Sequence, residues 1–186
     1  MEVEKEVRYL VSDDTWCLIH DNTTEYKPKE QMTDITMGKY GFNSFQQTGL
    51  VFRVRQKGDK ISLEIKKKIN NNEWLEESIP LDSMQRGISY LHLAGLEPYL
   101  FISRSREIRK FKGLKIFFDD VELLGKFIEI EYQDSTEATN ELNEFLNTFN
   151  ITGDPEELYG TIIIKKYNED LQFRQIFDEK MQELVK

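Results

Sequence analysis

The sequence feature that most constrains the fold is the stretch KIFFDDVELLGKFIEIE, residues 115–131. An apolar run at its start meets two aspartates, and turn residues follow. The residues after the turn alternate strictly, with Glu129 and Glu131 on one face of a strand and Ile128 and Ile130 on the other. The stretch therefore predicts a β-hairpin whose isoleucine face requires a hydrophobic core.

The opposite face of that strand carries the same charge twice. Glu129 and Glu131 would lie about 7 Å apart along the strand. Two carboxylates at this distance repel unless water, cations or basic side chains neutralise them. A solvated outer face of a sheet is one explanation. A closed cavity that binds a metal or a polycation is the other.

Length, charge and composition exclude several classes of protein. A chain of 186 residues predicts one domain. The formal net charge of −9 and the pI near 4.9 argue against nonspecific nucleic-acid binding. The single cysteine, Cys17, cannot form an internal disulfide, and the N-terminus lacks the pattern of a signal peptide. No apolar run reaches the roughly 18 residues of a membrane span, so a cytoplasmic protein is expected.

The periodicity along the chain predicts an α+β fold with about eight mostly antiparallel strands and helices packed outside them. The predicted strands cover residues 2–11, 29–37, 50–56, 60–68, 74–79, 99–111, 115–119 and 126–133. The predicted helices cover residues 13–20 after a Ser12 cap, 80–95, a stretch from Ser135, another from Asp154-Pro155, and 168–185. Residues 38–49 are predicted to be a loop, and residues 58–59 and 70–72 to be turns. We expect one domain over residues 1–186, with the helices of residues 135–186 packed on the sheet.

Charged residues recur on alternate positions of these strands, in blocks of one sign. The acids are Glu2, Glu4, Glu6, Asp119, Glu129 and Glu131, and the bases are Arg8, Arg53, Arg55, Lys66, Arg104 and Arg106. A solvated sheet usually mixes signs, because neighbouring like charges cost free energy. A closed barrel with a charged lumen explains the blocks better than an open sheet with one face in water.

Such a lumen predicts its own ligands. Clustered carboxylates hold Mg²⁺ or Mn²⁺ rather than zinc, since their oxygens are hard donors. Arginine forks bind phosphate oxygens two at a time, so the basic strands predict a polyanion. The chain has only two histidines, both in predicted helices, which makes a zinc site a poor candidate.

Several motifs recur along the chain: an ExExK-like start at Glu2, Glu4, Glu6 and Arg8, the strand Gly49-Arg53-Arg55, the strand Leu63 to Lys66, the pair Arg104 and Arg106, and the block Asp119, Val121, Leu124, Gly125, Phe127, Glu129, Glu131. In these motifs the sequence resembles the CYTH superfamily of triphosphate tunnel metalloenzymes. The last block is the most specific. The chain departs from the pattern at the ExExK lysine, which is either Glu6 or Arg8, and after Asp34, where a tyrosine is often found.

The resemblance implies an eight-stranded antiparallel tunnel that binds a triphosphate small molecule with Mg²⁺ or Mn²⁺. It implies metal ligands among Glu2, Glu4, Glu6, Asp119, Glu129 and Glu131, and phosphate-binding roles for Arg8, Arg53, Arg55, Lys66, Arg104 and Arg106. Arg53 and Lys66 would stabilise the charge of the transition state, and Asp119 would bind a second metal or orient water. Either Glu76 or Glu77 would face the tunnel, with Glu76 preferred.

Three functions share this apparatus. Hydrolysis of a triphosphate, such as inorganic tripolyphosphate, is preferred because it needs no base recognition. A class IV-type adenylate cyclase and a non-catalytic polyphosphate or nucleotide sensor are the alternatives. The C-terminal helices would pack on the barrel or on a second copy, which leaves a homodimer open. Trp16, Trp74, Phe145 and Phe149 are expected in the core, and Cys17 is expected to be a small buried residue.

Overall fold

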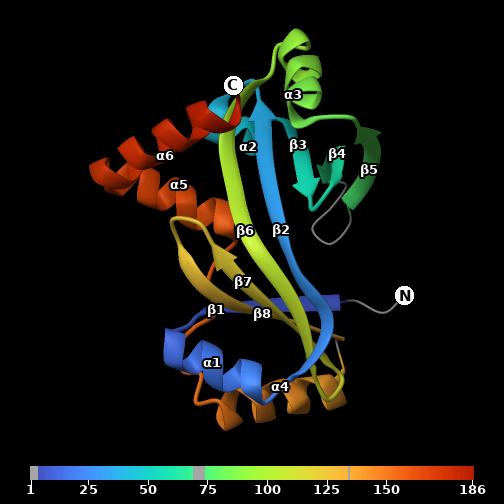
Figure 1. Cartoon of the computed structure of the whole chain (residues 1–186), viewed down its shortest axis with the longest axis vertical. Coiled ribbons are helices and arrows are strands. Elements are labelled where there is room, and N and C mark those ends of the chain that lie inside the picture. The colour runs from blue at the N-terminus through green and yellow to red at the C-terminus, as the bar shows by residue number, and fades with distance from the viewer. Residues whose placement is uncertain (1–3, 69–73, 134) are drawn as a thin grey trace. The chain divides into compact units, whose positions relative to one another are not determined.

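The computed structural model describes residues 4–68, 74–133 and 135–186, without the side chains of Glu4 and Trp74. The described residues form eight strands, with β3 to β5 and β6 to β8 as consecutive runs and helices before and after these runs (Figure 1). The strands form one sheet in the order β1-β8-β7-β6-β2-β3-β4-β5. The pairs β1–β8, β2–β3, β3–β4, β4–β5, β6–β7 and β7–β8 are antiparallel. The predicted fold class, α+β with antiparallel strands and helices outside them, is confirmed.

The chain divides into two compact units, each with its own core. Unit 1 contains residues 1–30 and 104–158, and unit 2 contains residues 31–103 and 159–186. Two long strands, β2 (Thr24–Gly38) and β6 (Glu97–Phe111), contribute residues to both units. The prediction of a single domain over residues 1–186 stays a prediction.

Unit 1 packs two helices on one face of its strands (Figure 1). Its further elements are β1 (Glu4–Leu10), α1 (Asp13–Asp21), β7 (Leu114–Val121), β8 (Gly125–Gln133) and α4 (Thr136–Thr148). The helices begin at the predicted caps, where the hydroxyls of Ser12 and Ser135 accept hydrogen bonds from the first turn. Both caps and the hairpin of residues 115–133 follow the sequence prediction.

The core of unit 1 confirms the alternation read from the sequence. Ile128 and Ile130 are fully buried and pack in one cluster with Phe145 and Phe149 of α4. Trp16 packs against this cluster and meets the ring of Phe118 edge-on, 4.9 Å between centroids. Because side chains alternate along a strand, the residues between the isoleucines point to the other face, where the charged side chains gather.

Unit 2 places a helical layer against the remaining strands. Its further elements are η1 (Gly41–Asn43), α2 (Ser44–Thr48), β3 (Leu50–Lys57), β4 (Lys60–Lys68), β5 (Trp74–Leu81), α3 (Met84–Leu93), α5 (Tyr159–Glu169) and α6 (Leu171–Leu184). Gly87 of α3 lies so close to Val54 and Leu81 that a Cβ there would come within 3.0 Å of both. Phe101 of β6 stacks on Phe177 of α6, with 4.6 Å between ring centroids.

Two predictions in unit 2, a loop over residues 38–49 and a helix over residues 80–95, were wrong in part. The expected loop of residues 38–49 contains η1 and α2, held by Ser44, whose hydroxyl accepts from the Tyr40 amide and donates to the Gly41 carbonyl. The helix expected over residues 80–95 begins only at Met84, because β5 continues through Pro80. Proline is tolerated there because β5 is an outer strand of the sheet order.

The other corrections are smaller. The helix expected from Asp154-Pro155 begins at Tyr159. Cys17, expected to be buried, is exposed on α1, because the buried residue of that helix is Ile19. The turn expected at residues 70–72 and the side chain of Trp74 lie outside the described residues. Among the helices that the structure describes, none combines the length and apolar character required to cross a membrane.

Candidate functional site

The charged side chains predicted to form the site fall into two networks, one in each unit. We call the first the Glu129 network: Glu6, Arg8, Arg104, Arg106, Lys115, Asp119, Glu129 and Glu131, all in unit 1. We call the second the Arg53 network: Asp34, Arg53, Arg55, Glu64, Lys66 and Glu76, all in unit 2. Each contains as many acids as bases.

Glu129 is the centre of the first network. It lies opposite Arg8 in the β1–β8 register, and its Oε2 accepts hydrogen bonds from Arg8 Nε at 3.2 Å and Nη2 at 3.0 Å. Its Oε1 accepts a bond from Arg106 Nη2 at 3.0 Å. The side chains of Arg8 and Glu129 are each only 8% exposed, so this carboxylate is held between two arginines with little water.

Asp119 fixes Arg106 from the neighbouring strand. Residues 106 and 119 are directly opposite in the β6–β7 register. Arg106 Nε donates to Asp119 Oδ1 at 2.6 Å, and Arg106 Nη2 donates to Asp119 Oδ2. The guanidinium of Arg106 also lies over the ring of Phe117, 4.6 Å from its centroid, and Arg104 Nε lies 3.9 Å from Asp119 Oδ2. Fully buried Asp119 therefore orients Arg106 with both of its oxygens.

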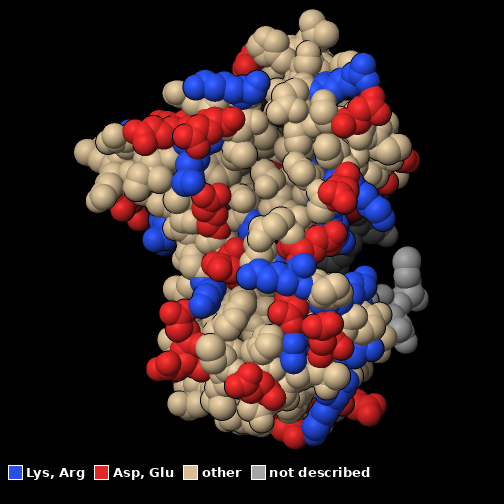
Figure 2. Space-filling model, viewed as in Figure 1, with Lys and Arg blue, Asp and Glu red and all other residues tan. Residues whose placement is uncertain are grey.

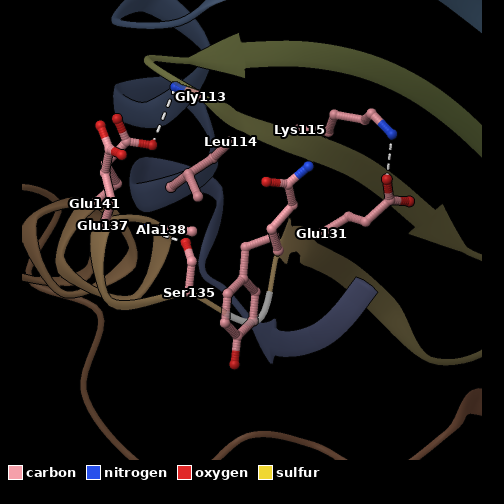
Figure 3. A pocket seen from close by; sticks show the side chains of 10 residues that line it. Gly113, Leu114, Lys115, Glu131, Ser135, Glu137, Ala138 and Glu141 are labelled. Atoms are coloured by element: carbon pink, nitrogen blue, oxygen red, sulfur yellow. Dashed lines mark hydrogen bonds and ion pairs between the residues drawn. The ribbon is translucent and has the colours of Figure 1, made fainter. Parts of the chain in front are cut away.

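The solvent-facing end of the Glu129 network is a pair of carboxylates. Glu6 and Glu131 are directly opposite in the β1–β8 register. Glu6 accepts a bond from Arg8 Nη2 at 2.7 Å, and Glu131 accepts one from Lys115. Figure 3 shows Lys115 and Glu131 pointing toward each other at one side of a cavity of about 310 Å³, which Tyr132 and the first turns of α4 also line.

The N-terminal motif can now be placed. Glu6 and Arg8 share the charged face of β1, opposite Glu131 and Glu129. This arrangement favours the register in which Glu4 and Glu6 are the acids and Arg8 stands at the position of the lysine. Glu2 and the side chain of Glu4 lie outside the described residues.

The Arg53 network connects four strands of unit 2, and its centre lies on β2, β3 and β4. Asp34 on β2 accepts bonds from Arg55 Nε at 2.6 Å and Arg55 Nη2 at 2.7 Å, and its Oδ2 lies 3.6 Å from Arg53 Nη1. Glu64 on β4 accepts a bond from Arg53 Nε at 3.0 Å and a further bond from Arg53 Nη2. Glu64 also accepts a bond from Arg55 Nη1 at 3.4 Å. Each acid thus contacts both arginines.

Lys66 and Glu76 border the same network. They are opposite in the β4–β5 register, and Lys66 Nζ donates to Glu76 Oε1 at 2.6 Å. Both line a cavity of about 170 Å³ with Arg53, Arg55 and Glu64. Strand alternation places Glu76 on the face of Lys66, and Glu77 also lines this cavity. The preference for Glu76 over Glu77 as the tunnel residue stays a prediction.

Sequence reasoning missed three residues of these networks. Glu64 and Lys115 were not candidates, and Asp34 entered only as a motif landmark. Two of them lie at even spacing from a candidate on the same strand, Glu64 from Lys66 and Lys115 from Asp119, so alternation alone could have placed these two on the charged face. Their partners lie on neighbouring strands, which the sequence does not align.

The carboxylates of the Glu129 network are candidate ligands for a metal ion. Among the residues that the structure describes, no group of three acidic, histidine or cysteine side chains is placed to hold an ion. Glu6 and Glu131 nevertheless offer hard oxygens from opposite strands. Mg²⁺ is usually held by one or two carboxylates together with substrate phosphates. The pair therefore fits a metal that arrives with a phosphate ligand, whereas both oxygens of Asp119 and of Glu129 are committed to arginine.

A comparison with protein families shows to which family the chain belongs. A family model for the CYTH domain matches residues 3–159. The chain belongs to the CYTH family. CYTH proteins act on triphosphates, generally with divalent metal ions. No curated protein sequence matches the chain.

Solved structures support the CYTH fold. The PH1819 protein from Pyrococcus horikoshii OT3 is 24% identical, with 88% of this chain and 99% of that chain covered and a TM-score of 0.67. A proposed adenylate cyclase from Vibrio parahaemolyticus is 18% identical, with coverage of 87% and 98% and a TM-score of 0.62. A proposed adenylyl cyclase from Hippeastrum, HpAC1, described as having a dominant triphosphatase activity, is 16% identical, with coverage of 89% and 96% and a TM-score of 0.61.

Proposed function

We propose that this CYTH protein hydrolyses a phosphoanhydride bond of a triphosphate, inorganic or organic, with Mg²⁺ or Mn²⁺. The observation that carries the proposal is the carboxylate pair Glu6 and Glu131, placed opposite each other beside arginines that are already oriented. The HpAC1 protein, which shares the fold, is described as mainly a triphosphatase. This supports hydrolysis over cyclisation as the first expectation.

The roles of the side chains follow from their contacts. Glu6 and Glu131 would hold the metal, with Glu2 and Glu4 as further proposed ligands; a bound metal would supply charge neutralisation and a lower pKa of bound water. Lys115 could release Glu131 for this role without leaving a buried charge, because both side chains are partly exposed.

The bases bind the phosphates and stabilise the charge that develops on the leaving oxygen. We assign this role to Arg8, Arg53, Arg55, Lys66, Arg104 and Arg106. Asp119 was predicted to bind a second metal or orient water. Since both its oxygens bind Arg106, we propose that it acts through Arg106 by fixing the direction of that guanidinium.

The test is a substrate panel with product identification. Purified protein is incubated with tripolyphosphate, ATP and thiamine triphosphate, each with Mg²⁺ or Mn²⁺. Release of orthophosphate supports the proposal. Formation of cyclic AMP and pyrophosphate from ATP would replace it with the cyclase, a name borne by the similarly folded Vibrio protein. Tight metal-dependent binding without turnover would leave a sensor.

A single variant tests the metal role. Glu131→Gln keeps the size of the side chain but removes its charge, so metal-dependent turnover should fall by at least about 100-fold. Asp120→Asn is the matched control, because it removes one exposed charge from the adjacent strand β7. Unchanged turnover in Glu131→Gln would refute the assignment. Homodimerisation and a cytoplasmic location stay predictions from the sequence.

A further inference from the structure

The position of Glu64 is at odds with a simple phosphate-binding face. It is an acid in the middle of the strongest cluster of bases in unit 2, and it lines the same cavity of about 170 Å³ as Arg53, Arg55 and Lys66. A negative charge there repels any phosphate that enters the cavity. Glu64 must therefore have a favourable effect on the site that offsets this repulsion of phosphate.

The contacts of Glu64 show what that contribution is. Arg53 and Arg55 are two residues apart on one face of β3, so their charges repel each other across about 7 Å. Glu64 Oε2 binds Arg53 through Nε and Nη2, and Glu64 Oε1 lies 3.4 Å from Arg55 Nη1. One carboxylate thereby fixes the directions of two guanidinium groups, and Asp34 meets the same two groups from the opposite strand.

The two acids differ in how they can affect a ligand. The side chain of Asp34 is 2% exposed, whereas that of Glu64 is 16% exposed, similar to the 17% of Arg53 and 19% of Arg55. Asp34 is therefore a buried support. Glu64 is about as exposed as the two arginines and lines the same cavity. Its charge therefore acts directly on a ligand in that cavity.

We propose that Glu64 is a positioning residue with two opposite effects, an inference that rests on the proposed function. It holds Arg53 and Arg55 in the orientation that the transition state requires, which raises kcat. It also repels the bound triphosphate, which raises KM. Because only interactions stronger in the transition state than in the ground state accelerate a reaction, the two effects are separable in kinetics.

Two substitutions separate them. Glu64→Gln removes the charge and one acceptor oxygen, so KM for the triphosphate should fall about fivefold while kcat falls about tenfold. Glu64→Asp keeps the charge but shortens the side chain, so kcat should fall without a gain in affinity. Asp59→Asn, in the turn of the same β3–β4 hairpin, is the charge-matched control and should change neither constant.

A binding measurement makes the outcome independent of turnover. Calorimetry with inorganic tripolyphosphate without metal should show tighter binding to Glu64→Gln than to the wild type, Glu64→Asp or Asp59→Asn. If the wild type binds or hydrolyses triphosphates and Glu64→Gln matches Asp59→Asn in KM, kcat and affinity, the inference on Glu64 is overturned alone. If the wild type does neither, the proposed function fails, and the inference with it. Circular dichroism and thermal melting confirm that each variant is folded.

Discussion

The Glu129 network and the Arg53 network both gather several like charges on one face of the sheet. They arrange their acids and bases in opposite ways. In unit 1 Asp119 and Glu129 lie on the adjacent strands β7 and β8, and Arg8 and Arg106 approach from β1 and β6. In unit 2 Arg53 and Arg55 lie on β3, and Asp34 and Glu64 approach from β2 and β4. In both, these groups contact opposite charges on neighbouring strands, which lowers the cost of concentrating charge on a sheet face.

The two networks differ at their solvent-facing ends. The Glu129 network ends in the carboxylate pair Glu6 and Glu131, whereas the Arg53 network ends in the ion pair of Lys66 and Glu76. The carboxylate pair therefore suits a cation, whereas the ion pair favours neither a cation nor an anion. On the face of the molecule seen in Figure 2, acids and bases are interspersed, so these ordered faces differ from the visible surface.

The largest expected effect tests the difference in burial. Glu129→Ala leaves Arg8 and Arg106 without their shared carboxylate. Because Arg8 and Glu129 are each only 8% exposed, the free energy of unfolding should fall by about 3 to 5 kcal/mol. Glu64→Ala, among side chains that are 16–19% exposed, should cost roughly 1 to 2 kcal/mol. Urea denaturation measures both. Equal losses would remove the distinction between the networks.

The next prediction uses metal to tell the two ends apart. Mg²⁺ or Mn²⁺ with tripolyphosphate should raise the stability of the wild type, by about 2.7 kcal/mol at a concentration 100 times Kd. Glu131→Gln should lose most of this stabilisation, and Glu76→Gln should keep its metal-dependent part, since Glu76 belongs to the end that holds no carboxylate pair. Thermal melts with and without metal measure it. A metal-dependent loss in Glu76→Gln instead would place the ion in unit 2.

The smallest expected effect compares the apolar sides of the two units. Burial raises the pKa of Tyr9 in unit 1 and of Tyr99 in unit 2, and the charge of Asp154 adds to the shift at Tyr9. A tyrosine whose pKa is raised by folding stabilises the protein below its unfolded pKa near 10, and this stability is lost as pH rises through the folded value.

Tyr9→Phe and Tyr99→Phe should therefore each flatten the alkaline fall in stability, by less than about 1 kcal/mol per tyrosine. Denaturation at a series of pH values from 8 upward measures the slope. An unchanged slope in both variants would show that neither phenol titrates differently on folding.

The sequence predicted the parts of the fold that rest on local periodicity. The hairpin of residues 115–133 and the caps at Ser12 and Ser135 were correct, because alternation and capping act over a few residues. The helix within residues 38–49 was missed because its order depends on a close contact: a Cβ on Gly38 would lie 2.2 Å from Ser44 Oγ. Such an approach leaves no periodic pattern.

The candidate site, like the fold, could be predicted from the sequence only as far as the alternation within single strands allows. Alternation placed Arg53, Arg106 and Glu129 on charged faces, and the contacts agree. Which acid meets which base depends on strand register, and register is set by packing across the whole sheet. For this reason the shared role of Glu64 between two arginines could not be predicted, although Glu64 lies only two residues before Lys66.

The internal pairing of the arginines has a consequence for ionic strength. Arginines whose charge is balanced by fixed carboxylate partners hold few mobile counterions, so a phosphate that binds beside these pairs releases few ions from the protein. Affinity for polyphosphate should then vary weakly with salt concentration, unlike that of an open basic surface. Changes in the salt content of the cell would then have little effect on how much ligand the protein binds.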